Sequence, residues 1–324
     1  MFSSDYFDRR VEEIISAISQ KNKIIYSSIS YAYKSGGKRI RPRFCLLCSE
    51  LIKDNSHQDD EKITLSSICV ELLHTASLML DDVVDNSNMR RGLPSVNAVF
   101  GNKLAVISAS YLIGLISKII SDLGNIDLVK KFSETSKLMA EGEALEFNIM
   151  LQTTYDLSRN FILENYFEVI KKKTSSLFSL SAVIPSIIYS KTEYLDLFAE
   201  LGTLTGMAFQ IKDDILDFTS DKIGKPSMKD LKEGKLTLPI ILSDHYDSVV
   251  NIMKKYVDES GFSIPDPDAE KIYYLVLSGG GIEKAEKYLE SVFNQIQEIL
   301  EKDIFKRKKE DFGKFIKFIV ERDF

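Results

Sequence analysis

The chain has 324 residues and a formal net charge of −6, with only 16 glycines and 7 prolines. The negative charge argues against a general nucleic-acid binder, because such proteins neutralise phosphates with an excess of lysine and arginine. Three cysteines, an odd number, favour a reducing compartment over a disulfide framework, so we expect a cytoplasmic protein.

Apolar residues recur at three- and four-residue spacing through most of the chain, which predicts an all-α protein. The predicted helices span residues 6–20, 42–53, 63–82, 103–120, 127–150, 159–190, 193–217, 235–254, 266–278, 281–303 and 308–321. No stretch between them resembles a flexible interdomain linker. We therefore expect one domain over residues 1–324.

Two stretches, 103–120 and 175–190, are apolar enough to raise the question of a membrane span. Serines, a glycine and a lysine interrupt the first, and Pro185 and several serines interrupt the second. Neither supplies about 20 consecutive apolar residues. We expect buried core helices here, and no transmembrane segment or secretory signal.

An acidic motif occurs twice, as "DDVVD" at 81–85 and as "DDILD" at 213–217, each at the end of an apolar helical run. The first and third aspartates of a motif lie within about 40° of each other on a helix, and the second about 100° round. One such cluster is most often a solvated turn, but two copies favour a binding site. Oxygen ligands without nearby histidine or cysteine suit Mg²⁺. The candidate ligands are Asp81, Asp82, Asp85, Asp213, Asp214 and Asp217.

Basic residues complement these acids. The segment "GGKRIRPR" at 36–43 combines a glycine turn, four cations and a helix start, which suits a phosphate site. A solvated loop and a nucleic-acid patch remain alternatives for this segment taken alone. Further cations are Arg90, Arg91, Lys173, Lys225 and Lys235. Bound metal ions would turn the acidic clusters into an anion site.

In this order, the segments "GGKRIRP", "ELLHTASLMLDDVVDNSNMRRGLPS", "EGEALEF", "YFEVIKKKTSSLF", "GMAFQIKDDILD" and "GKPSMKDLKEGKLTLP" resemble the trans-isoprenyl diphosphate synthases, above all the long-chain polyprenyl type. The resemblance implies one large helical bundle of the isoprenoid synthase fold, usually homodimeric, around a deep central cavity. The two acidic motifs would face each other and hold about three Mg²⁺ ions.

The resemblance also assigns roles to single residues. An allylic diphosphate would contact Arg90, Lys173, Lys225 and Lys235. Isopentenyl diphosphate would contact Lys38, Arg41, His74 and Arg91. The allylic C–O bond would ionise as pyrophosphate departs, and the double bond of isopentenyl diphosphate would attack the cation. Thr174 and Gln210 would direct oxygen dipoles at that cation.

Two positions depart from the family pattern. Leu80 stands where many relatives have histidine, which should perturb local hydrogen bonds rather than metal binding. Glu146 stands where an amide is often found, which puts the neighbouring polar network in doubt.

Chain length is expected to depend on the residues just before Asp81. Relatives often block the tunnel with aromatic residues here, whereas this chain has Ala76 and Ser77. Each helical turn adds about 5 Å of depth, so Leu73, or Phe147 or Met150 on an opposing helix, is the candidate floor. We expect a product of about thirty carbons or more, with a geranylgeranyl or farnesyl diphosphate synthase as the alternative.

Two other functions remain open. A terpene cyclase shares one acidic motif but lacks a second diphosphate pocket, and a non-catalytic subunit of a heteromeric synthase would be expected to lose carboxylates. The basic segment 305–311 suits either a solvated helix face or a weak association with membranes during product release.

Overall fold

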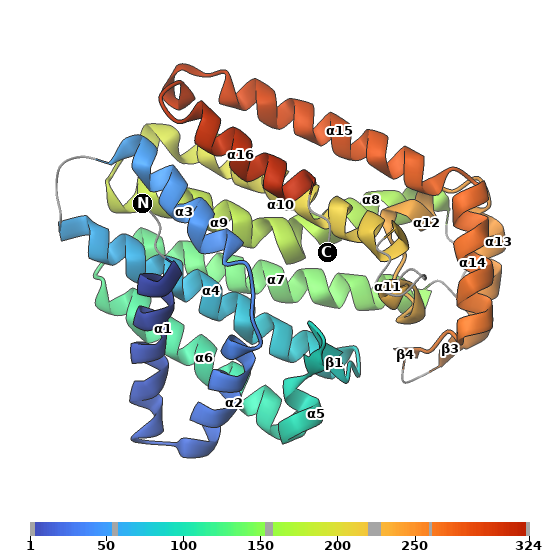
Figure 1. The fold of residues 1–324 in the computed structure, drawn as a ribbon, viewed down its shortest axis with the longest axis horizontal. Helices are drawn as coiled ribbons and strands as arrows, with labels where there is room; N and C mark the ends of the chain where they lie inside the picture. Colours follow the sequence, from blue (N-terminus) through green and yellow to red (C-terminus); the bar gives the residue numbers. More distant parts are fainter. Residues whose placement is uncertain (1–3, 54–57, 153–157, 220–227, 259–260, 322–324) are drawn as a thin grey trace. The chain divides into compact units, whose positions relative to one another are not determined.

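The computed structural model describes residues 4–53, 58–152, 158–219, 228–258 and 261–321 of the chain. In these ranges the regular structure is almost entirely helical, and the short strands form two antiparallel hairpins (Figure 1). The prediction of an all-α protein is confirmed.

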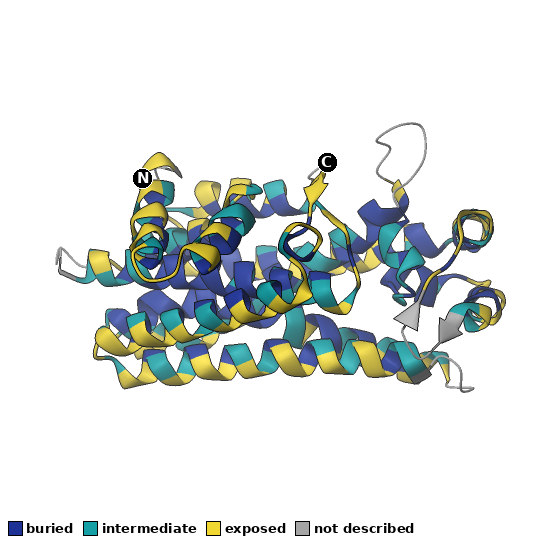
Figure 2. Cartoon of the chain, turned by 90° about the horizontal axis from the view of Figure 1, so that it is seen from below, coloured by how far each residue is buried: buried dark blue, intermediate teal, exposed yellow. Residues whose placement is uncertain are grey.

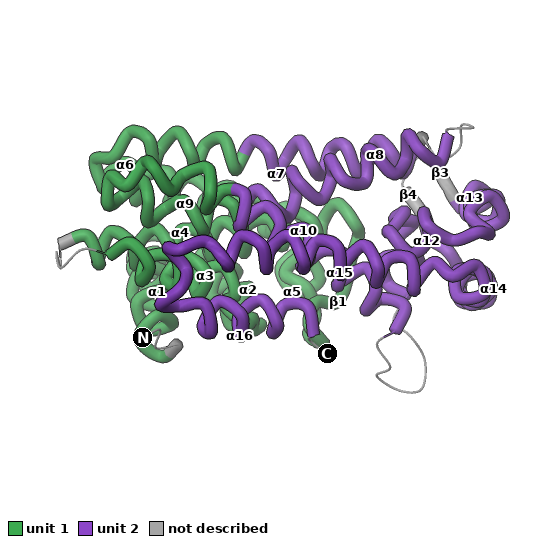
Figure 3. Tube along the Cα trace, turned by 90° about the horizontal axis from the view of Figure 1, so that it is seen from above, with its two compact units in different colours: residues 1–136, 177–199 green, residues 137–176, 200–324 purple. Residues whose placement is uncertain are grey.

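The chain divides into two compact units, each made of two separate segments (Figure 3). Unit 1 comprises Met1–Ser136 and Leu177–Ala199, and unit 2 comprises Lys137–Ser176 and Glu200–Phe324. The chain changes unit within α7 (Ile126–Gln152), at the start of α9 (Ser176–Ile188) and within α10 (Leu195–Thr219). The expectation of a single domain stays a prediction.

Unit 1 contains most of α9, the beginnings of α7 and α10, and a set of elements from the first part of the chain. These elements are α1 (Ser4–Ser19), α2 (Lys23–Lys34), α3 (Ile40–Ile52), α4 (Gln58–Val84), β1 (Met89–Arg90), β2 (Leu93–Pro94), α5 (Val96–Phe100), α6 (Asn102–Asp122) and the 3-10 helix η2 (Thr192–Tyr194). In the hairpin, Met89 pairs with Pro94 and Arg90 with Leu93.

Unit 2 contains the remainder of α7 and α10 and the elements of the second part of the chain. These are α8 (Arg159–Ile170), the π-helix η1 (Lys171–Ser175), α11 (Lys229–Lys232), α12 (Leu238–Leu242), α13 (Tyr246–Met253), η3 (Lys254–Tyr256), β3 (Val257–Asp258), β4 (Gly261–Phe262), α14 (Asp266–Ser278), α15 (Gly281–Leu300), η4 (Asp303–Phe305) and α16 (Lys309–Val320).

The core of unit 1 lies around the middle of α4, which packs against α3 and α6. Ile68, Cys69, Val70 and Leu72 are consecutive or nearly so, and all are fully buried. A helix that is apolar on every side belongs in a core, whereas most other helices bury one face and expose the other (Figure 2). The buried middle of α4 fixes the direction of its acidic C-terminal end.

Some boundaries differ from the prediction. Helix α2 lies in a stretch that we did not expect to be helical; its serines and β-branched residues have low helix propensity, but it packs on α1 and α6. The predicted helix 159–190 contains the π-helix η1, and 235–254 is broken between α12 and α13. The stretch between the predicted helices 63–82 and 103–120 contains the β1–β2 hairpin.

Among the described residues, α4 (from Asp59) and α6 are long and apolar enough to cross a membrane by length and composition alone. The core helix of a soluble protein passes the same test, and 67% of the most apolar window of α4 is buried, against 33% for α6. For α6, the expectation of a buried core helix holds for one face only. The free thiols Cys45, Cys48 and Cys69 are buried.

Candidate active site

The first acidic motif lies at the C-terminal end of α4, where the structure separates its carboxylates. Asp82 is 2% exposed and accepts a hydrogen bond from Arg90 Nε at 2.7 Å. The side-chain amide of Asn97 donates to the backbone carbonyl of Asp82 at 3.3 Å. Asp81 and Asp85 are partly exposed instead. Two carboxylates are therefore presented at the helix end, and Asp82 is held by an arginine.

A small pocket of about 30 Å³ lies beside this helix end, within unit 1. It collects arginines from the turn before α3 and from the β1–β2 hairpin, and an imidazole from α4. Its charged and imidazole side chains are Arg39, Glu71, His74, Asp82, Arg90 and Arg91. Three guanidinium groups and one imidazole face two carboxylates, so this pocket suits an anion.

His74 faces this pocket from α4, two helical turns before Asp81. Desolvation, and then the charge of Arg41 and Arg91, lowers the pKa of its imidazole well below the usual range. His74 is therefore neutral, and one ring nitrogen can donate a hydrogen bond while the other accepts one.

The turn before α3 brings the backbone close to Arg91. Gly36 and Gly37 have φ of 96° and 149°, in the region that favours glycine. One guanidinium nitrogen of Arg91 donates to the carbonyl of Gly36. A Cβ on Gly37 would lie 2.9 Å from Arg91 Nη1, so the glycine makes room for this guanidinium.

Lys38 and Arg41, the predicted substrate contacts of the basic segment 36–43, do not belong to the residues that line this pocket. Lys38 is exposed. Arg41 is 8% exposed, and its guanidinium lies 4.7 Å from the ring centre of Phe178. The structure thus brings Arg91 and His74 together in the pocket, whose lining includes neither Lys38 nor Arg41.

The second acidic motif, in α10, has one partly exposed carboxylate, Asp213, followed by the buried Asp214. Asp214 accepts hydrogen bonds from the Tyr166 hydroxyl at 2.7 Å, from Gln210 Nε2 at 3.0 Å and from the Leu238 backbone N–H at 3.2 Å. Burial raises its pKa to about 7, although the hydrogen bonds from Gln210 and Tyr166 oppose the rise.

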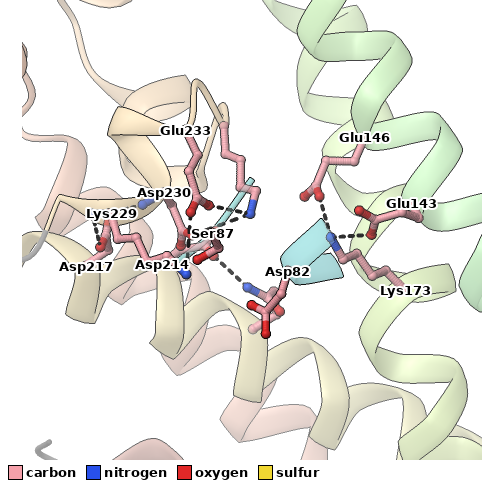
Figure 4. A network of polar contacts seen from close by, with 12 residues as sticks. Asp82, Ser87, Glu143, Glu146, Lys173, Asp214, Asp217, Lys229, Asp230 and Glu233 are labelled. Carbon is pink, nitrogen blue, oxygen red and sulfur yellow. Dashed lines mark hydrogen bonds and ion pairs between the residues drawn. The ribbon is translucent and has the colours of Figure 1, made fainter. Parts of the chain in front are cut away.

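Asp217, the third member of this motif, is 8% exposed and caps the short helix α11. Its two oxygens accept from the backbone N–H groups of Lys229 at 2.8 Å and Asp230 at 3.1 Å (Figure 4). Burial, and then the charge of Asp230, raises its pKa to about 7. Asp217 therefore ties α11 to the end of α10.

Lys173 lies in the π-helix η1, between two carboxylates of α7. Its Nζ is 2.5 Å from Glu143 Oε2 and 2.5 Å from Glu146 Oε2 (Figure 4). Gly142 allows the close approach of α7 and η1, because a Cβ there would lie 2.6 Å from the backbone nitrogen of Lys173. The unusual Glu146 is thus an ion-pair partner of a predicted substrate contact.

Thr174 and Gln210 belong to one hydrogen-bond chain. The Thr174 hydroxyl donates to Gln210 Oε1 at 2.8 Å, and the amide of Gln210 donates onward to Asp214. The orientation of this amide is therefore fixed from both sides. The chain connects η1 to the second acidic motif.

Of the two remaining predicted cations, Lys225 lies outside the described residues. Lys235 Nζ is 2.9 Å from Glu233 Oε2 and 3.8 Å from Asp230 Oδ1, and its side chain is 17% exposed. Lys235 is thus held close to the turn that Asp217 caps.

The predicted chain-length residues lie on α4. Ala76 is fully buried, Leu73 is 4% exposed and Ser77 is partly exposed. The Ser77 hydroxyl donates to the backbone carbonyl of His74, so this small side chain turns back onto its own helix. The predicted deep central cavity is not tested by these positions and stays a prediction.

Sequence reasoning singled out Glu146 without its partner Lys173, and it missed Glu71, Glu143 and Tyr166. Glu71 lies one turn before His74, and Glu143 shares one face of α7 with Glu146, so helical spacing could have found these two glutamates. Tyr166 precedes Lys173 by seven residues, but Lys173 lies in the π-helix η1. Regular α-helical spacing therefore does not give the relative direction of the two side chains.

Comparisons with known proteins identify the family of this chain. The family model for polyprenyl synthetase matches residues 22–260. The chain belongs to the polyprenyl synthetase family. An all-trans-nonaprenyl-diphosphate synthase (geranyl-diphosphate specific) from Rhodobacter capsulatus is 34% identical over 83% of this chain and 80% of its own length. The octaprenyl diphosphate synthase of Escherichia coli K12 is 34% identical over 73% of this chain and 70% of its own length.

Solved structures show the same fold. The heptaprenyl diphosphate synthase of Staphylococcus aureus superposes with a TM-score of 0.84 and 24% identity, over all of this chain and 99% of that one. A polyprenyl synthase from Caulobacter crescentus, solved with calcium and isoprenyl diphosphate, gives 0.83 and 22% over 99% and 96%. The predicted isoprenoid synthase fold is confirmed, and the chain is a prenyltransferase of the trans-polyprenyl diphosphate synthase class.

Proposed function

We propose that this enzyme condenses isopentenyl diphosphate head-to-tail with an allylic diphosphate and releases a trans long-chain polyprenyl diphosphate of about thirty carbons or more. The observation that carries the proposal is the combination of two acidic helix ends, on α4 and α10, with an arginine- and histidine-lined pocket beside the first. A terpene cyclase would need only one diphosphate site.

Mg²⁺ fits the oxygen ligands of the two acidic motifs. We assign metal contacts first to Asp81, Asp85 and Asp213, which are partly exposed. Asp82, Asp214 and Asp217 would hold these helix ends in place, since each already accepts hydrogen bonds from the chain. No three acidic or imidazole side chains among the described residues converge on a metal site of their own. Diphosphate oxygens would therefore complete the coordination of about three ions.

Substrate positions follow from the cations. Arg91 and neutral His74 would hold isopentenyl diphosphate in the pocket of unit 1. By the resemblance, Lys38 and Arg41 would contact it as well. Lys173, Lys225 and Lys235, together with Arg90, would contact the allylic diphosphate.

Bound Mg²⁺ would stabilise the charge that grows on departing pyrophosphate. The chain itself would orient both substrates and exclude water from the allylic cation. The Thr174 hydroxyl donates a hydrogen bond to Gln210 Oε1, so the lone pairs of the hydroxyl oxygen remain to face the cation. Asp214 keeps the Gln210 amide from rotating. The proton lost after condensation would pass to an oxygen of the departed pyrophosphate, which is the base formed in the reaction, and no protein nucleophile takes part.

The long product is supported by the small Ala76 and Ser77 and by the nonaprenyl and octaprenyl synthases among the relatives. We also propose a cytoplasmic homodimer that makes at most weak membrane contact. An apolar surface on α5 and α6 supports self-association, because Val99, Val106 and Ile107 are 48%, 40% and 54% exposed. The lysines of 305–311 give little support to a lipid contact, because Lys306, Lys308 and Lys309 pair with acids.

Labelled isopentenyl diphosphate tests the proposal. Purified protein with a farnesyl or geranyl primer and Mg²⁺ should incorporate the label, and a chelator should stop the reaction. Chromatography of the dephosphorylated product should show chains of about thirty carbons or more. A cyclic hydrocarbon would indicate a cyclase instead, and activity that requires an added protein would indicate a subunit.

A further inference from the structure

Arg39 lies at the centre of a buried ion-pair cluster that no catalytic role explains. It directly precedes α3, with φ of 49°, and its side chain is 10% exposed. Its Nε is 3.2 Å from Asp8 Oδ1 on α1, and its Nη1 is 3.1 Å from Glu71 Oε1 on α4. The Glu71 side chain is 5% exposed, so this pair is largely removed from water.

Tyr33 completes the cluster from α2. Its ring centre lies 3.9 Å from the Arg39 guanidinium carbon, and its carbonyl accepts from Arg39 Nη2 at 3.3 Å. The Tyr33 hydroxyl donates to Asp8. One guanidinium thus connects α1, α2 and α4. A group that stacks on a ring and donates to two carboxylates and a carbonyl at once requires arginine rather than lysine.

The cluster reaches the pocket through the glycine turn. A Cβ on Gly37 would lie 3.0 Å from Arg39 Nη1 and 2.9 Å from Arg91 Nη1, so the two guanidinium groups flank the same glycine. Arg91 in turn donates to the carbonyl of Gly36. The place of Arg39 therefore determines where this turn presents its carbonyl, and with it the place of Arg91.

The three arginines of the pocket differ in whether a carboxylate neutralises their charge. Arg39 is neutralised by Glu71 and Asp8, and Arg90 is neutralised by Asp82. Arg91 donates to a backbone carbonyl, and within the described ranges no carboxylate forms a salt bridge with it. An arginine without a carboxylate partner is the one whose charge remains for an anionic ligand.

We propose that Arg39 is a positioning residue for the non-allylic substrate, and that Asp8 and Tyr33 act through it on Arg91. The inference rests on the proposed function, since it takes isopentenyl diphosphate as the ligand of this pocket. Through Asp8, α1 would therefore affect substrate binding indirectly, since none of the described α1 residues lines the pocket. A small displacement of a diphosphate-binding group is enough to weaken binding and leave the reaction itself intact.

Asp8→Asn and Tyr33→Phe test this inference without emptying the core. Each should raise KM for isopentenyl diphosphate on the order of fivefold, with kcat and KM for the allylic primer unchanged. Glu12→Gln is the matched control: Glu12 also lies on α1 and pairs with α2, 3.5 Å from Lys34 Nζ, but both side chains are more than half exposed. That variant should keep all three constants.

Calorimetry with isopentenyl diphosphate alone gives a second readout that does not need turnover. Weaker binding to Asp8→Asn than to the wild type and to Glu12→Gln is the expected result. Unchanged binding, or an equal loss for both substrates, would overturn the inference, and so would a wild type that does not bind isopentenyl diphosphate. Binding without any incorporation of label would contradict the proposed function and leave this inference standing.

Discussion

Replacing Tyr166 with phenylalanine removes the shortest of three hydrogen bonds to a buried carboxylate. The Tyr166 hydroxyl lies 2.7 Å from Asp214 Oδ2, and Asp214 is 2% exposed. A hydrogen bond to a charged group contributes about 1.5–3 kcal/mol to stability, against about 0.5–1.5 kcal/mol between neutral groups. The cost of Tyr166→Phe should therefore depend on whether Asp214 is ionised.

The sign of the pH dependence follows from the pKa of Asp214. Burial raises that pKa from 3.8 to about 7, so the folded carboxyl is protonated at pH 5.5 and ionised at pH 8.5. A raised pKa means that this group favours the folded state at low pH and that this contribution is lost as pH rises through about 7. Burial raises the pKa of Tyr166 well above its usual value, so the tyrosine still donates at pH 8.5.

Urea unfolding of metal-free protein at the two pH values measures the effect. Tyr166→Phe should lower the free energy of unfolding by about 1 kcal/mol at pH 5.5 and by about 2–3 kcal/mol at pH 8.5. Tyr256→Phe is the control, because that hydroxyl also donates to an aspartate, Asp268, but at a partly exposed position. An equal loss at both pH values, or none, would refute the assignment of Asp214 as a buried, titrating carboxyl.

Three further substitutions probe the site. Ala76→Phe should shorten the product, because an aromatic ring about 7.5 Å down α4 from Asp81 stops the growing chain; an unchanged product length in chromatography would remove Ala76 from the tunnel wall. Glu146→Gln should lower KM for the allylic diphosphate several-fold, since it removes one of two carboxylates 2.5 Å from Lys173, and a raised KM would contradict this role. Gly142→Ala should lower the free energy of unfolding by about 1–3 kcal/mol, because the new Cβ would lie 2.6 Å from the backbone nitrogen of Lys173. An unchanged free energy of unfolding in urea would show that α7 can move away from η1.

Helical geometry predicted part of the first acidic motif correctly. It put the second aspartate about 100° from the first and about 60° from the third, and the structure buries Asp82 while Asp81 and Asp85 stay partly exposed. The same rule did not predict that Asp217 is buried. The backbone N–H groups of α11 donate to its carboxylate. Those groups lie twelve and more residues further along the chain, beyond any helical spacing.

The remaining surprises are also long-range or irregular. Periodicity predicts regular α-helix through 159–190, but the π-helix η1 adds a residue to the turn that carries Lys173 and Thr174. The Arg39–Glu71 pair joins residues 32 positions apart. Fold class follows from local patterns, whereas the partners of each charge depend on the tertiary arrangement.

We propose, on the basis of the family resemblance, that the acidic ends of α4 and α10 act on one metal-bound diphosphate. A double-mutant cycle tests it directly: Mg²⁺-dependent binding of an allylic diphosphate analogue, with sulfur in place of the bridging oxygen, is measured for wild type, Asp81→Asn, Asp213→Asn and the double variant. We expect each single substitution to weaken binding strongly and the double variant to be little weaker than either. Losses that simply multiply in the double variant would show that the two carboxylates serve separate sites, and would contradict the account.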